Sequence, residues 1–519
     1  MINLGGGSSV VERHLPKVEV AGSNPVHRLK YLMKKINISS LPSEVLSIWK
    51  KILDNGYFAY LVGGCVRDLL LKRKPKDWDI TTNAKPEEIL KIFGDSAFYE
   101  NRFGTVGVKT GSTEESLKVI EVTTFRIEGR YLDFRHPEEV IFAEKLEDDL
   151  KRRDFTINAL ALDFEGNIID YFGGLKDLEE KKIKAVGNPE ERFYEDALRM
   201  MRAIRLACEL NFEIEEKTFL AIQKNKELIN YIAYERIRDE FNRIIMSENA
   251  VRGIELLRES GLLREILPEL ERGYGVSQNK HHKYDVYTHS LKSLEYAVKK
   301  NFPLYLRLSA LFHDIGKPLT KQGEGPEATF YNHEIVGAKI VKKILERFRY
   351  PKEIVKKVTH LVRHHMFYLE IDKVTPAAVR RFVRRVGEEN LDDLFKLREA
   401  DRIGSGVPKA YPYRLRYLKF LIEKVKLEPI SPKMLKINGY DILNLGVPQG
   451  PKVGYILKIL LDEVIEDPKR NEREYLIQRA SELKNLSDEE LKKMAEEGEE
   501  KIKKIEKEKE EEIKKKYGI

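Results

Sequence analysis

The stretch LVGGCVRDLLLKRKPKDWDITT, from Leu61 to Thr82, decides the fold of this chain. It begins with an apolar run that ends in two glycines, continues with a helical pattern and closes with a second apolar run. Asp77 and Asp79 enter that second run, with Trp78 between them. In an extended strand, side chains two residues apart share a face. The stretch therefore predicts strand, helix and strand, with both carboxylates on one face.

This carboxylate pair suits the binding of divalent metal ions. Two carboxylates on one face can hold two Mg²⁺ ions about 4 Å apart, which activate an attacking hydroxyl and stabilise a leaving pyrophosphate. A D-x-D pattern alone is more often a solvated turn. Here two glycines precede a helix, and only glycine lets backbone amides approach a triphosphate closely. We therefore expect Asp77 and Asp79 to bind the metal, and Gly64 and Arg67 to contact nucleotide phosphates.

The residues around this stretch indicate a mixed α/β region. An amphipathic helix is expected over residues 41–53, and further strands near 105–108, 118–125 and 156–164. From about residue 187 onward the spacing of apolar residues is almost wholly helical. The pattern predicts a mixed sheet with helices, followed by helical regions.

Five segments in order resemble the class II tRNA nucleotidyltransferase and bacterial poly(A) polymerase family, within the polymerase-β superfamily. Besides the first stretch, they are LEDDLKRRDFTINALALD (146–163), DYFGGLKDL (170–178), EDALRMMRAIRLA (195–207) and ERIRDEFNRII (235–245). The resemblance implies an α+β fold, with a polymerase-β-like nucleotidyltransferase head followed by an all-helical neck, an HD domain and a C-terminal body. It implies template-independent, two-metal addition of CCA to the 3′ end of tRNA, with tRNA, CTP and ATP as partners and Mg²⁺ as cofactor.

The second of these segments adds further site residues. By motif position the resemblance makes Asp154 a third catalytic aspartate. It assigns Gly64, Arg67 and Arg153 to the binding of the phosphates and ribose of the incoming nucleotide. For Arg152, a surface ion-pair cluster with the acidic residues 147–149 is the alternative.

A pair of residues in the fourth segment is suited to reading the base. Asp196 and Arg199 are three apart in a helical pattern, so they are expected to share a face. Cytosine and adenine present an amine beside an acceptor nitrogen, which match an Asp acceptor and an Arg donor. Guanine and uracil present the opposite arrangement and would leave buried polar groups unpaired. Arg202 and Arg205 follow Arg199 at the same three-residue spacing, and the resemblance implies that they bind nucleotide. A surface i,i+3 ion pair is the alternative.

A second set of chemistry-bearing residues lies in YTHSL, LSALFHDIGK, YNHEIVGA, LVRHHMF and LREADRIGS. Their order resembles the HD phosphohydrolase motif, in which a bound metal activates a water against a phosphate ester. The expected ligands of one divalent ion are His289, His313, Asp314 and Asp401. His333 and His364 fall between them. Imidazoles with carboxylates suit Ni, Co or Mn. A degenerate HD fold kept for its helices is the alternative.

The choice of product depends on one loop. TFRIEGRYLDFRHP (124–137) resembles the flexible loop of CCA-adding enzymes, which would switch the site from CTP to ATP. We therefore expect CCA addition, with an A-adding enzyme or a poly(A) polymerase as the alternative. A hypothesis from another enzyme class is that the protein is a phosphodiesterase or phosphatase that acts on RNA ends through its HD domain. A third makes it a non-catalytic RNA-binding protein.

Residues 437–457 resemble the family's C-terminal tRNA-contacting region. Gly446, Gly450 and Gly454 suit a turn and a helix start near a phosphate backbone. The alternative is that these glycines only mark loops between helices and have no role in binding.

Composition restricts the class of protein. The chain has 519 residues and a net charge of +8, which suits but does not demand a polyanionic partner. Its only cysteines, Cys65 and Cys208, exclude a disulfide framework and fit a reducing compartment. There is no run of about 18 apolar residues, so no membrane span is expected. We expect a cytoplasmic protein; the sequence does not predict its oligomeric state.

The first residues lack any helical or strand period. Their GSNP, at 22–25, can be encoded by a sequence like the T-arm of a tRNA gene. One hypothesis is therefore a translated tRNA gene with the true start at Met33, and the other is a natural extension. The expected division is a doubtful extension (1–32), nucleotidyltransferase head (33–180), helical neck (181–270), HD domain (271–405), C-terminal tRNA-binding region (406–486) and charged tail (487–519).

Overall fold

The computed structural model describes residues 35–101, 104–128, 140–279, 282–367, 374–425 and 431–495. The hypothesis about residues 1–32 lies outside these residues, as does most of the expected flexible loop. Backbone contacts divide the chain into two compact units. The first contains residues 1–199 and 212–221, and the second contains residues 200–211 and 222–519.

A seven-stranded mixed sheet forms the centre of the first unit, in the order β3-β4-β5-β2-β1-β8-β9. Its strands are β1 (Ala59–Val62), β2 (Asp79–Thr82), β3 (Ala97–Asn101), β4 (Thr105–Lys109), β5 (Val119–Thr124), β8 (Leu160–Leu162) and β9 (Ile168–Asp170). β2 pairs in parallel with β5, and the other neighbours pair antiparallel. The sheet confirms the expected α+β head.

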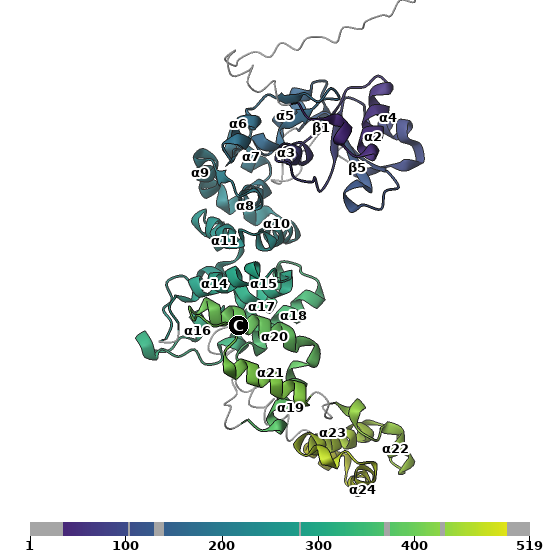
Figure 1. The fold of residues 1–519 in the computed structure, drawn as a ribbon, viewed down its shortest axis with the longest axis vertical. Helices are drawn as coiled ribbons and strands as arrows, with labels where there is room; N and C mark the ends of the chain where they lie inside the picture. The colour runs from purple at the N-terminus through teal and green to yellow at the C-terminus, as the bar shows by residue number, and fades with distance from the viewer. Residues whose placement is uncertain are drawn as a thin grey trace, which may run out of the picture. The chain divides into compact units, whose positions relative to one another are not determined.

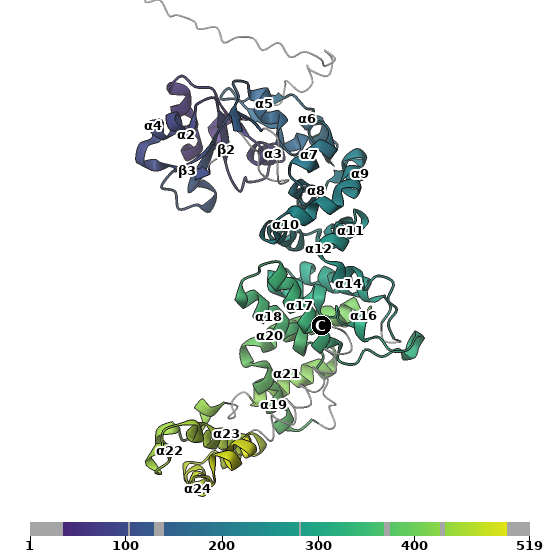
Figure 2. The same cartoon turned by 180° about the vertical axis from the view of Figure 1, so that it is seen from behind.

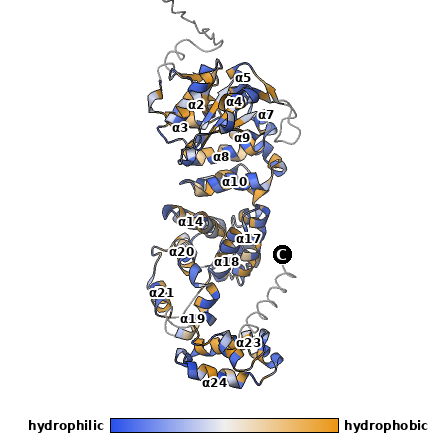
Figure 3. Cartoon of the chain, turned by 90° about the vertical axis from the view of Figure 1, so that its right-hand side faces the viewer, coloured by the Kyte–Doolittle hydropathy of each residue, from blue (hydrophilic) through white to orange (hydrophobic). Residues whose placement is uncertain are grey.

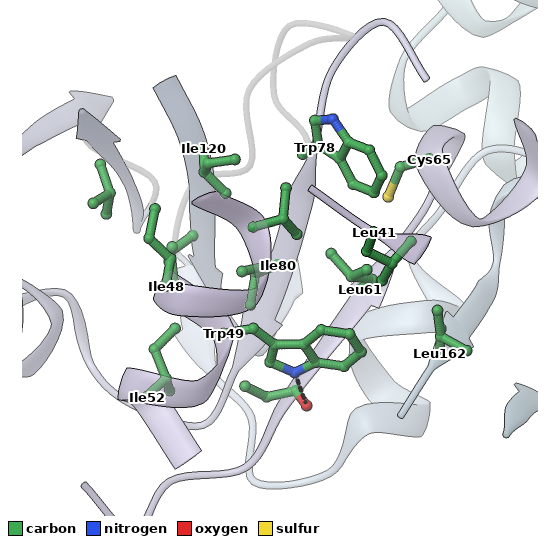
Figure 4. Packing of buried hydrophobic residues seen from close by; sticks show 14 of the residues in the cluster. Leu41, Ile48, Trp49, Ile52, Leu61, Cys65, Trp78, Ile80, Ile120 and Leu162 are labelled. Carbon is green, nitrogen blue, oxygen red and sulfur yellow. Dashed lines mark hydrogen bonds between the residues drawn. The ribbon is translucent and has the colours of Figure 1, made fainter. Parts of the chain in front are cut away.

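The core of this unit forms where α2 (Ser43–Asp54) and α4 (Pro86–Phe93) pack beside the strands (Figure 1). Trp49 of α2 is fully buried, and its indole N–H donates a 2.9 Å hydrogen bond to the Ala59 carbonyl (Figure 4). A buried tryptophan needs such a partner for its N–H. This core holds β1 and β2, the two strands that carry the decisive stretch.

The remaining elements of the first unit are short. They are α3 (Gly64–Leu70), β6 (Arg126–Glu128), β7 (Val140–Phe142), α5 (Leu146–Lys151), α6 (Gly174–Glu179), β10 (Lys182–Ile183), α7 (Pro189–Glu195) and β11 (Glu213–Ile214). Two helices, α8 (Leu198–Leu210) and α9 (Glu216–Asn225), have residues in both units.

The second unit is helical in the part that the structure describes, as expected. Its longer helices are α10 (Tyr234–Met246), α11 (Ala250–Glu259), α14 (Val286–Lys299), α15 (Leu304–Phe312), α17 (His333–Arg347), α18 (Lys352–His364), α19 (Pro376–Val386), α20 (Glu388–Gly404), α21 (Tyr413–Val425), α23 (Pro451–Glu466) and α24 (Arg473–Leu483). The shorter ones are α12 (Leu262–Ile266), α13 (Pro268–Glu271), α16 (Lys317–Thr320) and α22 (Gly439–Asn444). α17 packs on α18 (Figure 2). α14 packs on α20, and α15 contacts α14, α18 and α20.

Polar and apolar residues alternate along these helices (Figure 3). Within the described ranges, no helix is long and apolar enough to cross a membrane. The expected turn and helix start in the C-terminal region are present, with Gly446 at φ 87° and Gly450 directly before α23. The beginning of the expected charged tail is helical over residues 488–495, and Leu491 and Ala495 are buried in a core with α23 and α24.

Candidate active site

Asp77 and Asp79 lie at the entrance to β2. Asp77 is exposed, Trp78 is buried, Asp79 is half-buried and Ile80 is buried, which is the predicted alternation. The strand begins at Asp79. Its partner strand β1 pairs Val62 with Asp79 and ends there. The chain turns at Gly63, directly after β1, so the pairing of β1 with β2 ends at Asp79. On the other side of β2, the Trp78 carbonyl accepts the backbone N–H of Glu121 at 3.1 Å.

That turn is made by two glycines bordered by charged side chains. Gly63 has φ 78° and ψ −135°, a conformation that residues with a side chain rarely adopt. A methyl group built on Gly63 would lie 2.8 Å from Nη1 of Arg153 and 3.4 Å from Oδ2 of Asp79. One built on Gly64 would lie 3.6 Å from Nη2 of Arg67 and 3.7 Å from Oδ1 of Asp77. Both carboxylates and two guanidinium groups thus surround the turn, and at Gly63 the close approach of Arg153 and the positive φ require glycine.

A hydrogen-bond chain fixes one of these guanidinium groups. Nη1 of Arg67 donates to Oδ1 of Asn158 at 2.7 Å, and Nδ2 of Asn158 donates to Oδ1 of Asp154 at 3.1 Å. The backbone N–H of Phe155 donates to the same oxygen at 2.8 Å. The expected third aspartate therefore orients Arg67 through Asn158. Sequence reasoning missed Asn158, although it lies four residues after Asp154 in the second motif.

The two arginines of that motif differ in their surroundings. Nε and Nη2 of Arg152 donate to Oδ1 of the buried Asp149 at 2.9 and 2.8 Å, while Nη2 of Arg153 lies 3.5 Å from Oδ2. Burial raises the pKa of Asp149, but the two nearby cations lower it by more. Arg152 therefore forms an ion pair, as the alternative expected, but with the buried Asp149 rather than in a surface cluster. Nε of Arg153 is buried without a hydrogen-bond partner among the described residues, and its Nη1 faces the glycine turn.

The expected base-reading pair is only partly helical. Asp196 lies between α7 and α8 with φ −139° and ψ 103°, and its Oδ1 accepts the backbone N–H of Leu198 at 3.0 Å. The expectation of one shared helix face was therefore wrong, because Asp196 caps α8 from outside. Arg199 is on α8. Its guanidinium donates to Oε2 of Glu195 at 2.7 Å and to the Arg152 carbonyl at 3.1 Å.

Further along α8, Arg202 is half-buried and Arg205 is buried. Nε of Arg205 lies 3.0 Å from Oε2 of Glu240 on α10. Burial lowers the pKa of Arg205 to about 10, against the attraction of Glu240. This ion pair joins the fourth and fifth motifs within the second unit. The expected contact of Arg202 and Arg205 with nucleotide stays a prediction.

The second set of expected ligands converges in the HD region. His289 of α14, His313 and Asp314 after α15, and Asp401 of α20 are all buried. Nε2 of His289 lies 2.9 Å from Nε2 of His313, 3.0 Å from Oδ2 of Asp314 and 3.4 Å from Oδ1 of Asp401. These four residues form a group that can hold a metal ion, as expected.

A second ligand group shares one residue with the first. Nε2 of His333 lies 3.3 Å from Oδ1 of Asp314, and Nε2 of His365 lies 3.5 Å from the same oxygen. These three residues also form a group that can hold a metal ion. Asp314 therefore offers Oδ2 to one pair of histidines and Oδ1 to the other.

Backbone hydrogen bonds orient three of these imidazoles. Nδ1 of His313, His333 and His365 lies 2.9, 2.7 and 2.7 Å from the backbone carbonyl three residues earlier. An Nδ1–H that donates to a carbonyl leaves Nε2 as the free lone pair, which is the form that binds metals. Two such nitrogens 3.3 Å apart, on His333 and His365, repel each other unless a cation lies beside them. The donor set thus fits divalent transition metals.

Three residues of this region differ from expectation or were missed. His364 does not join the ligands: its ring lies 4.5 Å from that of His360, and burial lowers its pKa to about 3. His365 takes the expected place, because it keeps helical dihedrals after α18 and continues the buried face of Val358, Leu361 and Val362. Sequence reasoning also missed Lys317, whose Nζ lies 2.6 Å from Oδ2 of Asp314. Its charge helps hold the pKa of that carboxyl well below the usual value, against the effect of burial.

Comparison with known proteins places these sites in a family. Family models match residues 59–184 (poly A polymerase head domain), 211–273 (probable RNA and SrmB-binding site of polymerase A) and 286–405 (HD domain). The CCA-adding enzyme of Lactococcus lactis subsp. lactis (strain IL1403) is 33% identical over 450 residues, covering 84% of this chain and 97% of that enzyme. The chain belongs to the CCA-adding enzyme family. This family consists of nucleotidyltransferases that use divalent metal ions, and its head domain contains the carboxylate pair.

Other members of the CCA-adding enzyme family match over different lengths. The enzyme of Lactobacillus delbrueckii subsp. bulgaricus (strain ATCC 11842) is 46% identical over 233 residues, which are 45% of this chain and only 58% of that enzyme. The solved structure of the Bacillus stearothermophilus CCA-adding enzyme with CTP is 29% identical, with a TM-score of 0.62 over 85% of this chain and 96% of that one. The Thermotoga maritima CCA-adding enzyme with tRNA, 20% identical with a TM-score of 0.52, shares the fold.

Proposed function

We propose that this chain adds CCA to the 3′ end of tRNA, using CTP and ATP. The observation that carries the proposal is the glycine turn at Gly63, bordered by the carboxylates of Asp77 and Asp79 and the guanidinium groups of Arg67 and Arg153. Cations and carboxylates around an open backbone suit a nucleoside triphosphate with its metal. The related Bacillus stearothermophilus enzyme, of similar fold, was solved with CTP.

The residues of the turn fit the Mg²⁺ that such a reaction uses. Asp77 and Asp79 would hold it, and it would lower the pKa of the attacking 3′-hydroxyl and stabilise the pyrophosphate leaving group. Arg67 and Arg153 bind the triphosphate oxygens, since guanidinium forms charge-assisted hydrogen bonds with phosphate. Asp154 keeps Arg67 in place through its hydrogen bonds with Asn158.

In this proposal Asp196 and Arg199 select the base of the incoming nucleotide. The contacts of Arg199 with Glu195 and the Arg152 carbonyl hold its guanidinium in place before a nucleotide binds. A fixed donor discriminates better than a mobile one, because a base that cannot accept leaves it unpaired. In this proposal residues 33–180 are the catalytic head, 181–270 the neck and 406–486 the tRNA-binding region.

The test is an addition assay on a tRNA transcript that lacks its terminal CCA. The transcript is incubated with Mg²⁺ and all four nucleoside triphosphates, and the extended 3′ end is sequenced. The proposal expects CCA and no further extension. A second transcript that already ends in CC is assayed in parallel. Extension of only this second transcript, by a single A, would identify an A-adding enzyme, and a long A tail would identify a poly(A) polymerase; either would overturn CCA addition.

A second function is proposed for the HD region, on the observation that two ligand groups share Asp314. The histidines and aspartates would hold Ni, Co or Mn, which would supply an activated water for hydrolysis of a phosphate ester. In this proposal Lys317, whose Nζ lies 2.6 Å from Oδ2 of Asp314, would contact a phosphate oxygen of the substrate. The test compares wild type with Asp314→Ala for phosphate release and for opening of a 2′,3′-cyclic phosphate on RNA, with each metal. Absence of hydrolysis by the wild type with all three metals would make this region a scaffold.

A further inference from the structure

Three aromatic rings form a row along α21. Tyr413, Tyr417 and Phe420 are spaced four and three residues apart, so they share one face of the helix. The rings of Tyr413 and Tyr417 have centroids 6.0 Å apart and planes inclined by 20°. Those of Tyr417 and Phe420 are 6.4 Å apart and inclined by 29°. We call these three residues the aromatic row.

The aromatic row faces solvent. Tyr413 is 61% exposed and Phe420 is 62% exposed, and Tyr417 is half-buried. The other face of the helix anchors it, because Leu415, Leu418, Ile422 and Val425 are buried in a core with α19 and α20. The row is therefore not needed to hold α21 in place. A cluster of exposed large rings is costly to keep in water and usually marks an interaction site.

Positive charge accompanies the aromatic row. The helix carries the cations Arg414, Arg416, Lys419 and Lys424, and one acid, Glu423. Arg414, Arg416 and Lys419 are exposed and alternate with the rings along the sequence. A partner that buries this surface must therefore offer flat apolar groups together with negative charge.

We infer that the aromatic row binds the unpaired bases of an RNA, with the interleaved cations meeting its phosphates. Single-stranded nucleic acid combines the two required features, since every base has a π-face and every nucleotide a negative charge. Because neighbouring rings are nearly parallel, successive bases of one RNA strand can stack on successive rings. The inference rests on the proposed function for the identity of the RNA, which would be tRNA and its unpaired loop bases.

The test measures RNA binding by the full chain without nucleoside triphosphates. The probes are a short fluorescein-labelled single-stranded RNA, a blunt duplex of the same length and a tRNA transcript, followed by fluorescence anisotropy. The first variant, Tyr413→Leu with Tyr417→Leu and Phe420→Leu, keeps apolar area but removes the π-faces. The second, Tyr413→Phe with Tyr417→Phe, keeps all the rings. Tyr99→Leu removes an exposed tyrosine of the first unit, 53% exposed, and is the control.

The leucine variant should bind the single-stranded RNA and the tRNA at least about tenfold more weakly than wild type, because base stacking on aromatic rings supplies much of such binding. Its affinity for the duplex should change by less than about twofold, since duplex bases offer no free π-face. The phenylalanine variant and Tyr99→Leu should bind all three probes like wild type. The melting temperatures of all variants should match, because the row is exposed.

Three results would overturn the inference. One is wild-type affinity of the leucine variant for the single-stranded RNA. Another is an equal loss for the single strand and the duplex. The third is a wild-type dimer that the leucine variant dissociates with unchanged RNA binding, measured by light scattering, which would make a second copy of the chain the occupant. Binding is measured without nucleotide addition, so failure of the proposed CCA activity would be a separate result.

Discussion

Nη1 of Arg153 occupies the space that a side chain at Gly63 would need, since a methyl group built on Gly63 lies 2.8 Å from it. The φ of 78° at Gly63 also disfavours any residue other than glycine. The glycine therefore serves both the turn and the site. It lets the chain leave β1 sharply and lets the arginine approach the backbone where a triphosphate would bind.

Gly63→Ala should reduce nucleotide addition by about a hundredfold, because displacing a positioned group by about an ångström costs a factor of this size. The strained backbone should lower the free energy of unfolding by about 2 kcal/mol. Initial rates and denaturant unfolding measure the two effects. Gly56→Ala is the matched control: Gly56 has φ 85°, and a methyl group there meets no atom within 4 Å. It should lose similar stability but keep its rate. A normal rate for Gly63→Ala would refute the role of this turn.

Asp149→Asn should destabilise the protein by about 3 kcal/mol near neutral pH, since it leaves Arg152 and Arg153 facing a buried neutral group. The folded-state pKa of Asp149 is depressed. The stability that the Asp149 carboxylate contributes is therefore fully present above its unfolded-state pKa of about 3.9. It is lost as the pH falls through the lower pKa of the folded state. The difference in free energy of unfolding between variant and wild type, measured with denaturant, should become smaller only in strong acid. A constant difference down to the acid transition would contradict the ion pair.

Asp196→Ala combined with Arg199→Ala should blur the choice of base. The ratio of kcat/KM for CTP and ATP to that for GTP and UTP should fall by at least about tenfold, because the unpaired donor and acceptor no longer penalise the wrong base. Circular dichroism checks that the fold is retained. If the double variant still used only CTP and ATP, another part of the chain would read the base.

His365→Ala should remove one of two bound metals from the HD region, whereas His364→Ala should remove none. The two histidines are adjacent in sequence, but Nε2 of His365 lies 3.5 Å from Oδ1 of Asp314, while the ring of His364 lies beside that of His360, tilted by 60°. Metal content after loading with Ni, Co or Mn, measured by mass spectrometry on the purified chain, gives the stoichiometry. Asp314→Ala should lose both metals, since it serves both groups. Equal metal content in the His364 and His365 variants would show that the second group does not bind.

Local patterns predicted much of the fold and part of the site. The alternation around Trp78 depends only on neighbouring residues, so both carboxylates were placed correctly. The order of the motifs led to the correct family. Asp196 was misplaced because the break between α7 and α8 contains no glycine or proline, and the helical spacing runs through it without interruption.

Other parts of the site depend on contacts between segments distant in sequence. Asn158 acquires its role from Arg67, which lies 91 residues earlier in the sequence. The burial of Arg205 likewise requires Glu240 on another helix, which spacing along α8 does not reveal. Lys317 is different, because its partner Asp314 is only three residues earlier, and this spacing could have indicated the contact. The choice between the adjacent His364 and His365 could have been made from the sequence, because His365 continues the helical spacing of the buried Val358, Leu361 and Val362.

The most direct measurement of the central claim is the single-turnover rate of CTP addition to tRNA lacking CCA, for Asp77→Asn and Asp79→Asn beside wild type. Each substitution keeps the shape of the side chain but removes the charge that would hold the metal. Asp95→Asn, an exposed aspartate of the same unit, is the control. The account predicts that both rates fall at least about a thousandfold, equivalent to about 4 kcal/mol of activation free energy, with unchanged melting temperatures and a normal rate for the control. A rate within a few-fold of wild type for either variant would contradict it.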